Sequence, residues 1–135
     1  MGQQQLLLIV LGVIIVGIAV VVGINVFTAS SLEANKSALV ADLQTIGSMA
    51  QQYYRKPAAM GGGGNTFTGW VVPQQLKQTA NMSAVIDETG IAAQSVTLIA
   101  TGTDEDADGA SITVTMIFDQ NEITSVAFSD AAAAE

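Results

Sequence analysis

The sequence predicts an α+β protein in which one long N-terminal helix packs on a small antiparallel sheet. Three observations lead to this fold class. An uninterrupted apolar run begins at Leu6, an amphipathic stretch without proline follows as far as Lys56, and three β-rich segments occupy the C-terminal half. Beyond the apolar run, the 135-residue chain is long enough for one small domain with a single core.

Residues 1–28 are predicted to form a hydrophobic helix. No polar side chain occurs from Leu6 to Ile24, and at about 1.5 Å per residue this run spans roughly 28 Å, close to the hydrocarbon thickness of a bilayer. No basic residue precedes the run, and it exceeds the apolar core of about 7–15 residues found in secretory signal peptides. A membrane-spanning helix is therefore favoured over a cleavable secretory signal.

Residues 29–56 are predicted to continue the same helix as an amphipathic segment. Pro57 prevents its continuation, so the complete helix would hold about 50 residues and measure roughly 75–80 Å. A coiled coil is a competing interpretation, but the strand-rich half needs a helix to cover it. The apolar side chains recur at helical spacing, and we expect the following to pack on the sheet: Leu32, Leu39, Leu43, Ile46, Ala50 and Tyr53.

Residues 57–68 are predicted to be a glycine-rich joint between helix and sheet. The run Gly61–Gly64 predicts a flexible backbone. Aromatic residues flank the run, and we expect them to pack between the helix end and the sheet. The alternative is an exposed patch for adhesion or subunit contact. These residues are Tyr53, Tyr54, Phe67 and Trp70.

Residues 69–135 are predicted to form an antiparallel β head domain. The segments 95–101, 111–118 and 123–128 are β-rich with alternating character, and turn signals at Asp108-Gly109 and 119–122 separate them. Strands joined by such short links favour a meander. Residues 69–73 and 84–89 are weaker strand candidates, and Pro73 is a favourable start for a short helical turn.

The charge is distributed unevenly along the chain. Residues 1–80 carry four basic and two acidic residues, a balance of +2, whereas residues 81–135 carry ten acidic and no basic residues, giving the net charge of −8. This surface would repel nucleic acid. It either keeps an exposed domain soluble, or the acidic part of one copy faces Arg55 and Lys56 of another. Without Cys or His, disulfides, thiolate zinc sites and Ser/His or Cys/His catalysis are excluded.

Alternating carboxylates precede a glycine at Asp104, Asp106, Asp108 and Gly109. They resemble the first half of a calcium loop, but the twelfth position counted from Asp104 is Thr115 rather than the bidentate Glu that such a loop needs. We therefore favour a charged hairpin tip. A weak calcium site is the alternative, and calcium is the single cofactor that the sequence suggests.

The order of these elements resembles that of a type IV pilin or pseudopilin, and the resemblance covers the whole chain as architecture. Met1-Gly2 before an apolar run is similar to a very short prepilin leader, which implies cleavage by a prepilin peptidase between Gly2 and Gln3. Family members usually carry a glutamate at the fifth mature position. Counted from Gln3, that position is Leu7 here, and the neighbouring glutamines would supply neutral hydrogen bonds instead.

The resemblance implies a non-enzymatic structural subunit that is inserted in the membrane as a precursor and then polymerises into an extracellular pilus-like filament. Its implied partners are copies of itself, the inner membrane before assembly, and an assembly platform with an ATPase motor. A secretion-system pseudopilin and a single-span, membrane-anchored extracytoplasmic binding domain are the alternatives.

A helix that is apolar on all sides must be buried by lipid or by protein. Small residues such as Ala19 and Gly23 allow close approach of a second helix. The residues expected in the filament core are Leu6, Leu7, Leu8, Ile9, Leu11, Ile14, Val16, Ile18, Val20, Val22, Ile24 and Phe27.

Overall fold

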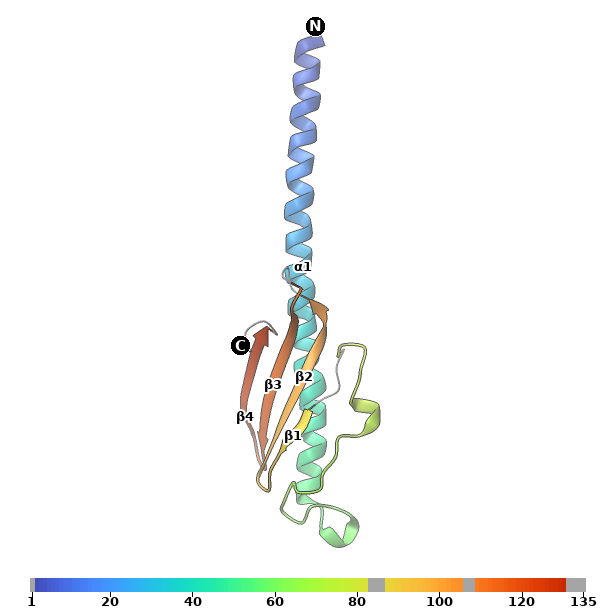
Figure 1. Ribbon diagram of the computed structural model, residues 1–135, viewed down its shortest axis with the longest axis vertical. Helices are drawn as coiled ribbons and strands as arrows, with labels where there is room; N and C mark the ends of the chain where they lie inside the picture. The colour runs from blue at the N-terminus through green and yellow to red at the C-terminus, as the bar shows by residue number, and fades with distance from the viewer. Residues whose placement is uncertain (1, 83–86, 106–108, 131–135) are drawn as a thin grey trace.

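A computed structural model describes residues 2–82, 87–105 and 109–130. It shows a long helix whose second half carries an antiparallel sheet (Figure 1), so the predicted α+β fold class is confirmed. The elements are helix α1 (Gly2–Arg55), the short 3₁₀ helices η1 (Ala58–Met60) and η2 (Gln74–Leu76), and the strands β1 (Asp87–Ile91), β2 (Ser95–Glu105), β3 (Ser111–Asp119) and β4 (Ile123–Asp130).

Helix α1 is a single helix of 54 residues, about 80 Å long at the usual rise per residue. It contains no proline, and Pro57 follows its last turn, where the missing N–H and the restricted preceding residue end helical geometry. The predicted continuous helix is thus present from residue 2 to residue 55. Its apolar half extends beyond the sheet, and its amphipathic half forms one layer of the head (Figure 1).

The four strands follow one another in the order β1-β2-β3-β4, all antiparallel. This is the predicted meander, with β1 at 87–91 replacing the weaker candidate at 84–89; residues 83–86 lie outside the described part of the chain. Residues 69–73 are not a strand. Gly69 adopts a φ of 86° and the Trp70 N–H donates to the Phe67 carbonyl, so the chain turns there, and η2 follows Pro73.

The core lies between the amphipathic half of α1 and one face of β2 and β3. Side chains alternate between buried and half-buried along both strands, because successive residues of a strand point to opposite faces. From the helix, Leu39, Leu43, Ile46 and Ala50 are fully buried, as predicted, and Leu32 packs against the core with partial exposure. The strands contribute Val96, Leu98, Ala100, Ile112, Val114, Met116 and Phe118.

Of the two adjacent tyrosines, Tyr54 rather than Tyr53 completes the buried stripe. Tyr54 is 8% exposed and its ring lies 4.8 Å from that of Phe67. Tyr53 is half-buried, and its hydroxyl donates to the Thr68 carbonyl at 3.2 Å. Tyr53 and Tyr54 lie three and four residues after Ala50, and both spacings place a side chain on the same helix face. The spacing alone therefore did not decide between them. Tertiary contacts decide, because the Tyr54 side chain packs on Phe67 and reaches the Gln94 and Gln120 side chains, whereas Tyr53 lies at the edge of the core.

The glycine run, predicted as a flexible joint, folds back onto the end of α1. The N–H groups of Gly63, Gly64 and Asn65 donate to the carbonyls of Tyr53, Lys56 and Tyr54 respectively. These carbonyls would otherwise lack partners at the helix C-terminus. A Cβ on Gly63 would lie 1.8 Å from the Thr66 carbonyl oxygen, so the close approach requires glycine there.

Gly47 brings the backbone of α1 close to the ring of Phe118. A Cβ at this position would lie 2.1 Å from Phe118 Cε1, and the ring itself is only 1% exposed. The missing side chain therefore makes room for the largest β3 side chain in the core.

Gly47→Ala should destabilise the head although alanine is the better helix former by about 1 kcal/mol. The added methyl would overlap the buried Phe118 ring, and such overpacking costs about 1–3 kcal/mol. Thermal unfolding, followed by the fluorescence of Trp70, should therefore show a lower midpoint. Ser48→Ala, at the adjacent exposed position, serves as the control. An unchanged or raised midpoint for Gly47→Ala would contradict this packing.

Polar side chains fix the upper part of the head to the helix. Asn35 is buried, and its Nδ2 donates to the Asn81 carbonyl at 3.2 Å and to Thr103 Oγ1 at 3.5 Å. Asp42 accepts hydrogen bonds from Thr79 Oγ1 and Asn81 Nδ2. The loop before β1 is thereby held at a defined height along α1.

Candidate functional site

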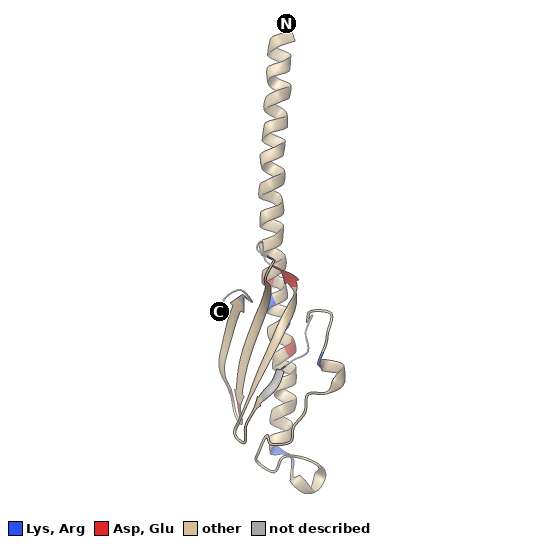
Figure 2. Ribbon diagram, viewed as in Figure 1, with Lys and Arg blue, Asp and Glu red and all other residues tan. Residues whose placement is uncertain are grey.

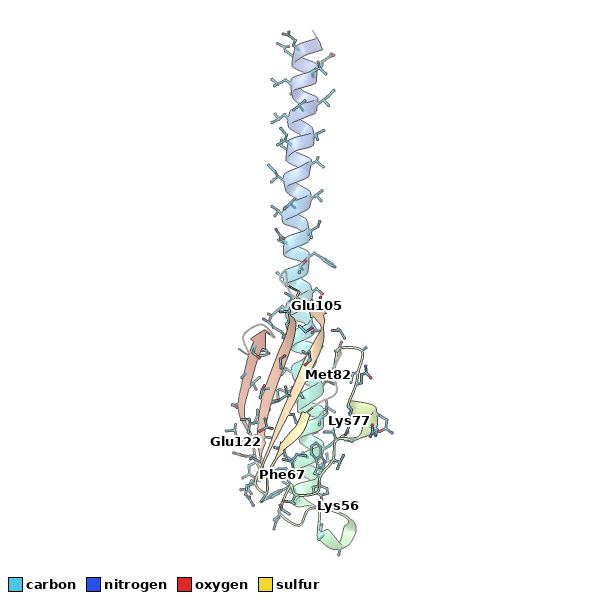
Figure 3. All side chains as sticks on the ribbon, in the orientation of Figure 1. Lys56, Phe67, Lys77, Met82, Glu105 and Glu122 are labelled. Carbon is cyan, nitrogen blue, oxygen red and sulfur yellow. The ribbon has the colours of Figure 1, made fainter. Side chains whose placement is uncertain are left out.

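The apolar half of α1 is uncovered. All the residues predicted for a filament core, from Leu6 to Phe27, are between 50% and 75% exposed, and Figure 3 shows their side chains extending outward around the helix. No charged residue occurs before Glu33. Because an apolar patch of this size is rare on a soluble monomer, this segment is the candidate functional site.

By length and composition, this half of α1 can cross a membrane. A helix of this kind near the N-terminus serves as a membrane anchor or as a signal sequence, and both roles agree with the observed exposure. The helix therefore defines a chain that needs an apolar partner, either lipid or protein.

Small residues provide places where another helix can approach closely. A Cβ at Gly12, Gly17 or Gly23 would meet no atom within 4 Å, so these glycines are not explained by contacts with the described residues of the same chain. In membrane proteins small residues at such positions allow the backbones of two helices to come together. The apolar segment is therefore suited to helix–helix packing as well as to lipid.

The change from apolar to polar surface occurs where α1 enters the head. Ser31 Oγ donates to Asp104 Oδ2 at 2.6 Å, and Phe27, Ser31, Asp104 and Glu105 line a shallow recess of about 290 Å³. Carboxylates are costly in a hydrocarbon core. The lipid or protein surface that covers the apolar half of α1 must therefore end near Phe27 and Ser31, where this recess begins.

The calcium hypothesis remains a prediction. Asp104 is hydrogen-bonded to Ser31, whereas Asp106 and Asp108 lie outside the described residues. Within the part of the chain that the structure describes, carboxylates form no group of three suited to a metal ion.

The described charged residues lie in the head and not in the apolar half of α1 (Figure 2). Figure 2 shows the ribbon of the apolar half free of charged residues, and basic residues where α1 ends. Arg55 and Lys56 are exposed at that end, while Asp104 and Glu105 lie at the opposite end of the head. The predicted contact between the acidic part of one copy and the basic end of another stays a prediction.

The aromatic residues near the glycine run belong to the core rather than to an exposed patch. Phe67 is fully buried, Trp70 is 7% exposed, and the Tyr54 hydroxyl is hydrogen-bonded to the Gln94 and Gln120 side chains. The prediction that these aromatic side chains pack between helix end and sheet is confirmed, with Tyr53 at the edge of the cluster.

The sequence did not predict the burial of Asn35 or the exposure of one strand face. Asn35, which looks like an ordinary polar helix residue, is buried, and the inner face of β4 is left uncovered. The burial of Asn35 could have been inferred from its spacing, because it lies four residues before Leu39 and eight before Leu43, on the same helix face. The exposure of the inner face of β4 depends on how many strands one helix covers, which the sequence pattern does not reveal.

Fold and site together define an α+β protein with an uncovered apolar N-terminal helix. Comparisons with protein-family models, curated proteins and solved structures found no match to this chain.

Proposed function

We propose that this protein is the structural subunit of an extracellular, type IV pilus-like filament, polymerising through its N-terminal helix. The observation that carries the proposal is the contrast within one helix. Its amphipathic half is buried in a complete core, while its apolar half is at least half exposed at the residues that would line a filament. Burial of an exposed aliphatic side chain contributes about 1.5–3 kcal/mol, so association of many copies is strongly favoured once they leave the membrane.

In the proposed pathway, the chain is inserted in the inner membrane as a precursor and processed between Gly2 and Gln3 by a prepilin peptidase. An assembly platform and an ATPase motor then move it into the filament. The architecture supports this order of events, because the same apolar helix suits both lipid and the interior of a filament. The role is structural rather than catalytic, consistent with a chain that contains neither His nor Cys.

Electron microscopy of material sheared from the cell surface tests the proposal. Antibodies against the head should label filaments along their whole length, and mass spectrometry of those filaments should find this chain as the main component. A secretion pseudopilin would give periplasmic protein without long surface fibres. A single-span anchored domain would remain dispersed in the membrane fraction, and that result would refute the filament proposal.

A further inference from the structure

Helix α1 leaves the inner face of β4 uncovered. Strand register pairs Val114 with Phe128 and Met116 with Val126, and paired residues of antiparallel strands point to the same face of the sheet. The two β3 side chains are fully buried, yet Phe128 is 51% and Val126 is 41% exposed. Ile123, paired with buried Phe118, is 39% exposed. At these three positions the core-facing side of β4 is therefore apolar and open.

A groove runs between this face and α1. It has a volume of about 440 Å³ and is lined by Glu33, Lys36, Ser37, Val40 and Phe128. Among the described lining residues, Glu33 and Lys36 cancel in formal charge, and Val40 and Phe128 provide apolar surface. Neighbouring strands lie about 4.8 Å apart and packed helices about 8–10 Å apart. Helix α1 packs on β2 and β3, and β4 lies to one side of it (Figure 1). These spacings therefore leave room for one further helix beside α1.

We propose that the groove binds residues 20–27, the end of the apolar helix, of a second copy of this chain. This inference rests on the proposed filament function. The described lining carries no net charge and includes the apolar side chains of Val40 and Phe128, which favours an uncharged, apolar occupant. Residues 20–27 carry no charge and are exposed. Met60 and Val71 are also exposed, but Lys56 and Lys77 make their loop cationic, so it matches the groove less well.

The contact fixes an axial displacement between the two copies. Copies inserted in one membrane with the same orientation have parallel helices. Residues 20–27 of the second copy would lie beside residues 33–40 of the first. The second copy is then displaced by about 13 residues, roughly 20 Å, toward the head of the first. At this displacement, residues 6–14 of the shifted copy still lie beside residues 19–27 of the first. The two surfaces differ, so the contact is heterologous and repeats into an open polymer rather than closing as a dimer.

Cysteine cross-linking tests the contact directly, because the chain has no cysteine of its own. Full-length protein carrying Phe128→Cys is co-assembled with protein carrying one cysteine at Val21, Val22, Val26 or Phe27, positions that together sample the sides of the helix at about 100° per residue. A short thiol cross-linker should join Phe128→Cys to at least one of them. Ala127→Cys, on the opposite face of the same strand, and Leu8→Cys, at the far end of the helix, are the matched controls and should give no such product.

A second readout uses charge. Phe128→Asp should lower the assembled fraction about tenfold or more, because the carboxylate would face an apolar helix, whereas Ala127→Asp should change it less than about twofold. Trp70 fluorescence establishes that both heads are folded.

The outcomes separate the two proposals. Filaments in which Phe128→Cys reacts only with Leu8→Cys or with itself would overturn the groove contact and leave the filament function standing. Wild-type protein that never polymerises would overturn both. Labelling of Phe128→Cys by a lipid-phase reagent in assembled material would assign the groove to lipid and also overturn the contact.

Discussion

Val16→Asp should abolish filament assembly. Val16 lies in the middle of the apolar half of α1 and is 62% exposed in the single chain, so assembly would bury it among other apolar helices. A carboxylate at the centre of an apolar span costs about 2.5–3.5 kcal/mol or more, and a lone charge has no partner there. In a polymer every subunit would carry such an unpartnered charge among apolar helices, so long filaments should be absent.

The measurement is the amount of filament sheared from cells expressing each variant, by sedimentation and electron microscopy. Val16→Leu keeps the site apolar and should assemble normally. Val16→Asn is polar but uncharged and should fall between the two. The membrane fraction is assayed in parallel to establish that each precursor is inserted. Normal filaments from inserted Val16→Asp protein would contradict burial of this residue in a polymer.

Leu43→Ala should cause a large loss of head stability. Leu43 is fully buried between α1 and the sheet. Removing its branched end forfeits the transfer free energy of the lost atoms and leaves a cavity, at a cost of about 2–5 kcal/mol. For a domain of about 100 residues, such a loss lowers the unfolding midpoint by roughly 10 °C or more.

Trp70 is the single tryptophan of the chain and is 7% exposed, so its emission reports the head alone. Far-ultraviolet circular dichroism would also record the apolar helix, which detergent keeps helical. The comparison is therefore a fluorescence melt of full-length protein in detergent, with Gln44→Ala at the adjacent exposed position as the control. A midpoint for Leu43→Ala within about 2 °C of wild type would show that this leucine is not central to the core.

The local elements were predictable because they depend on short-range patterns. The long apolar run indicates a helix that needs an apolar partner, and the stripe through Leu39 and Leu43 indicates an amphipathic helix. The alternating segments with short turns indicate an antiparallel meander. Burial confirmed the stripe at Leu39, Leu43, Ile46 and Ala50. The segment 69–73 misled because its valines and tryptophan have high β-propensity. In the structure Trp70 and Val72 are buried, and Val71 is exposed, in a loop that turns at Gly69.

By itself the sequence determined a chain with a long helix, an exposed apolar half and an antiparallel meander, since periodicity and charge act over a few residues. Tertiary structure alone decided that Tyr54 and not Tyr53 enters the core, that the glycines cap the helix, and that Gly47 makes room for Phe118. It also decided that one helix covers β2 and β3 while the inner face of β4 stays open. These features depend on which surfaces meet across distant parts of the chain, and the relative widths of a helix and a four-stranded sheet set that geometry.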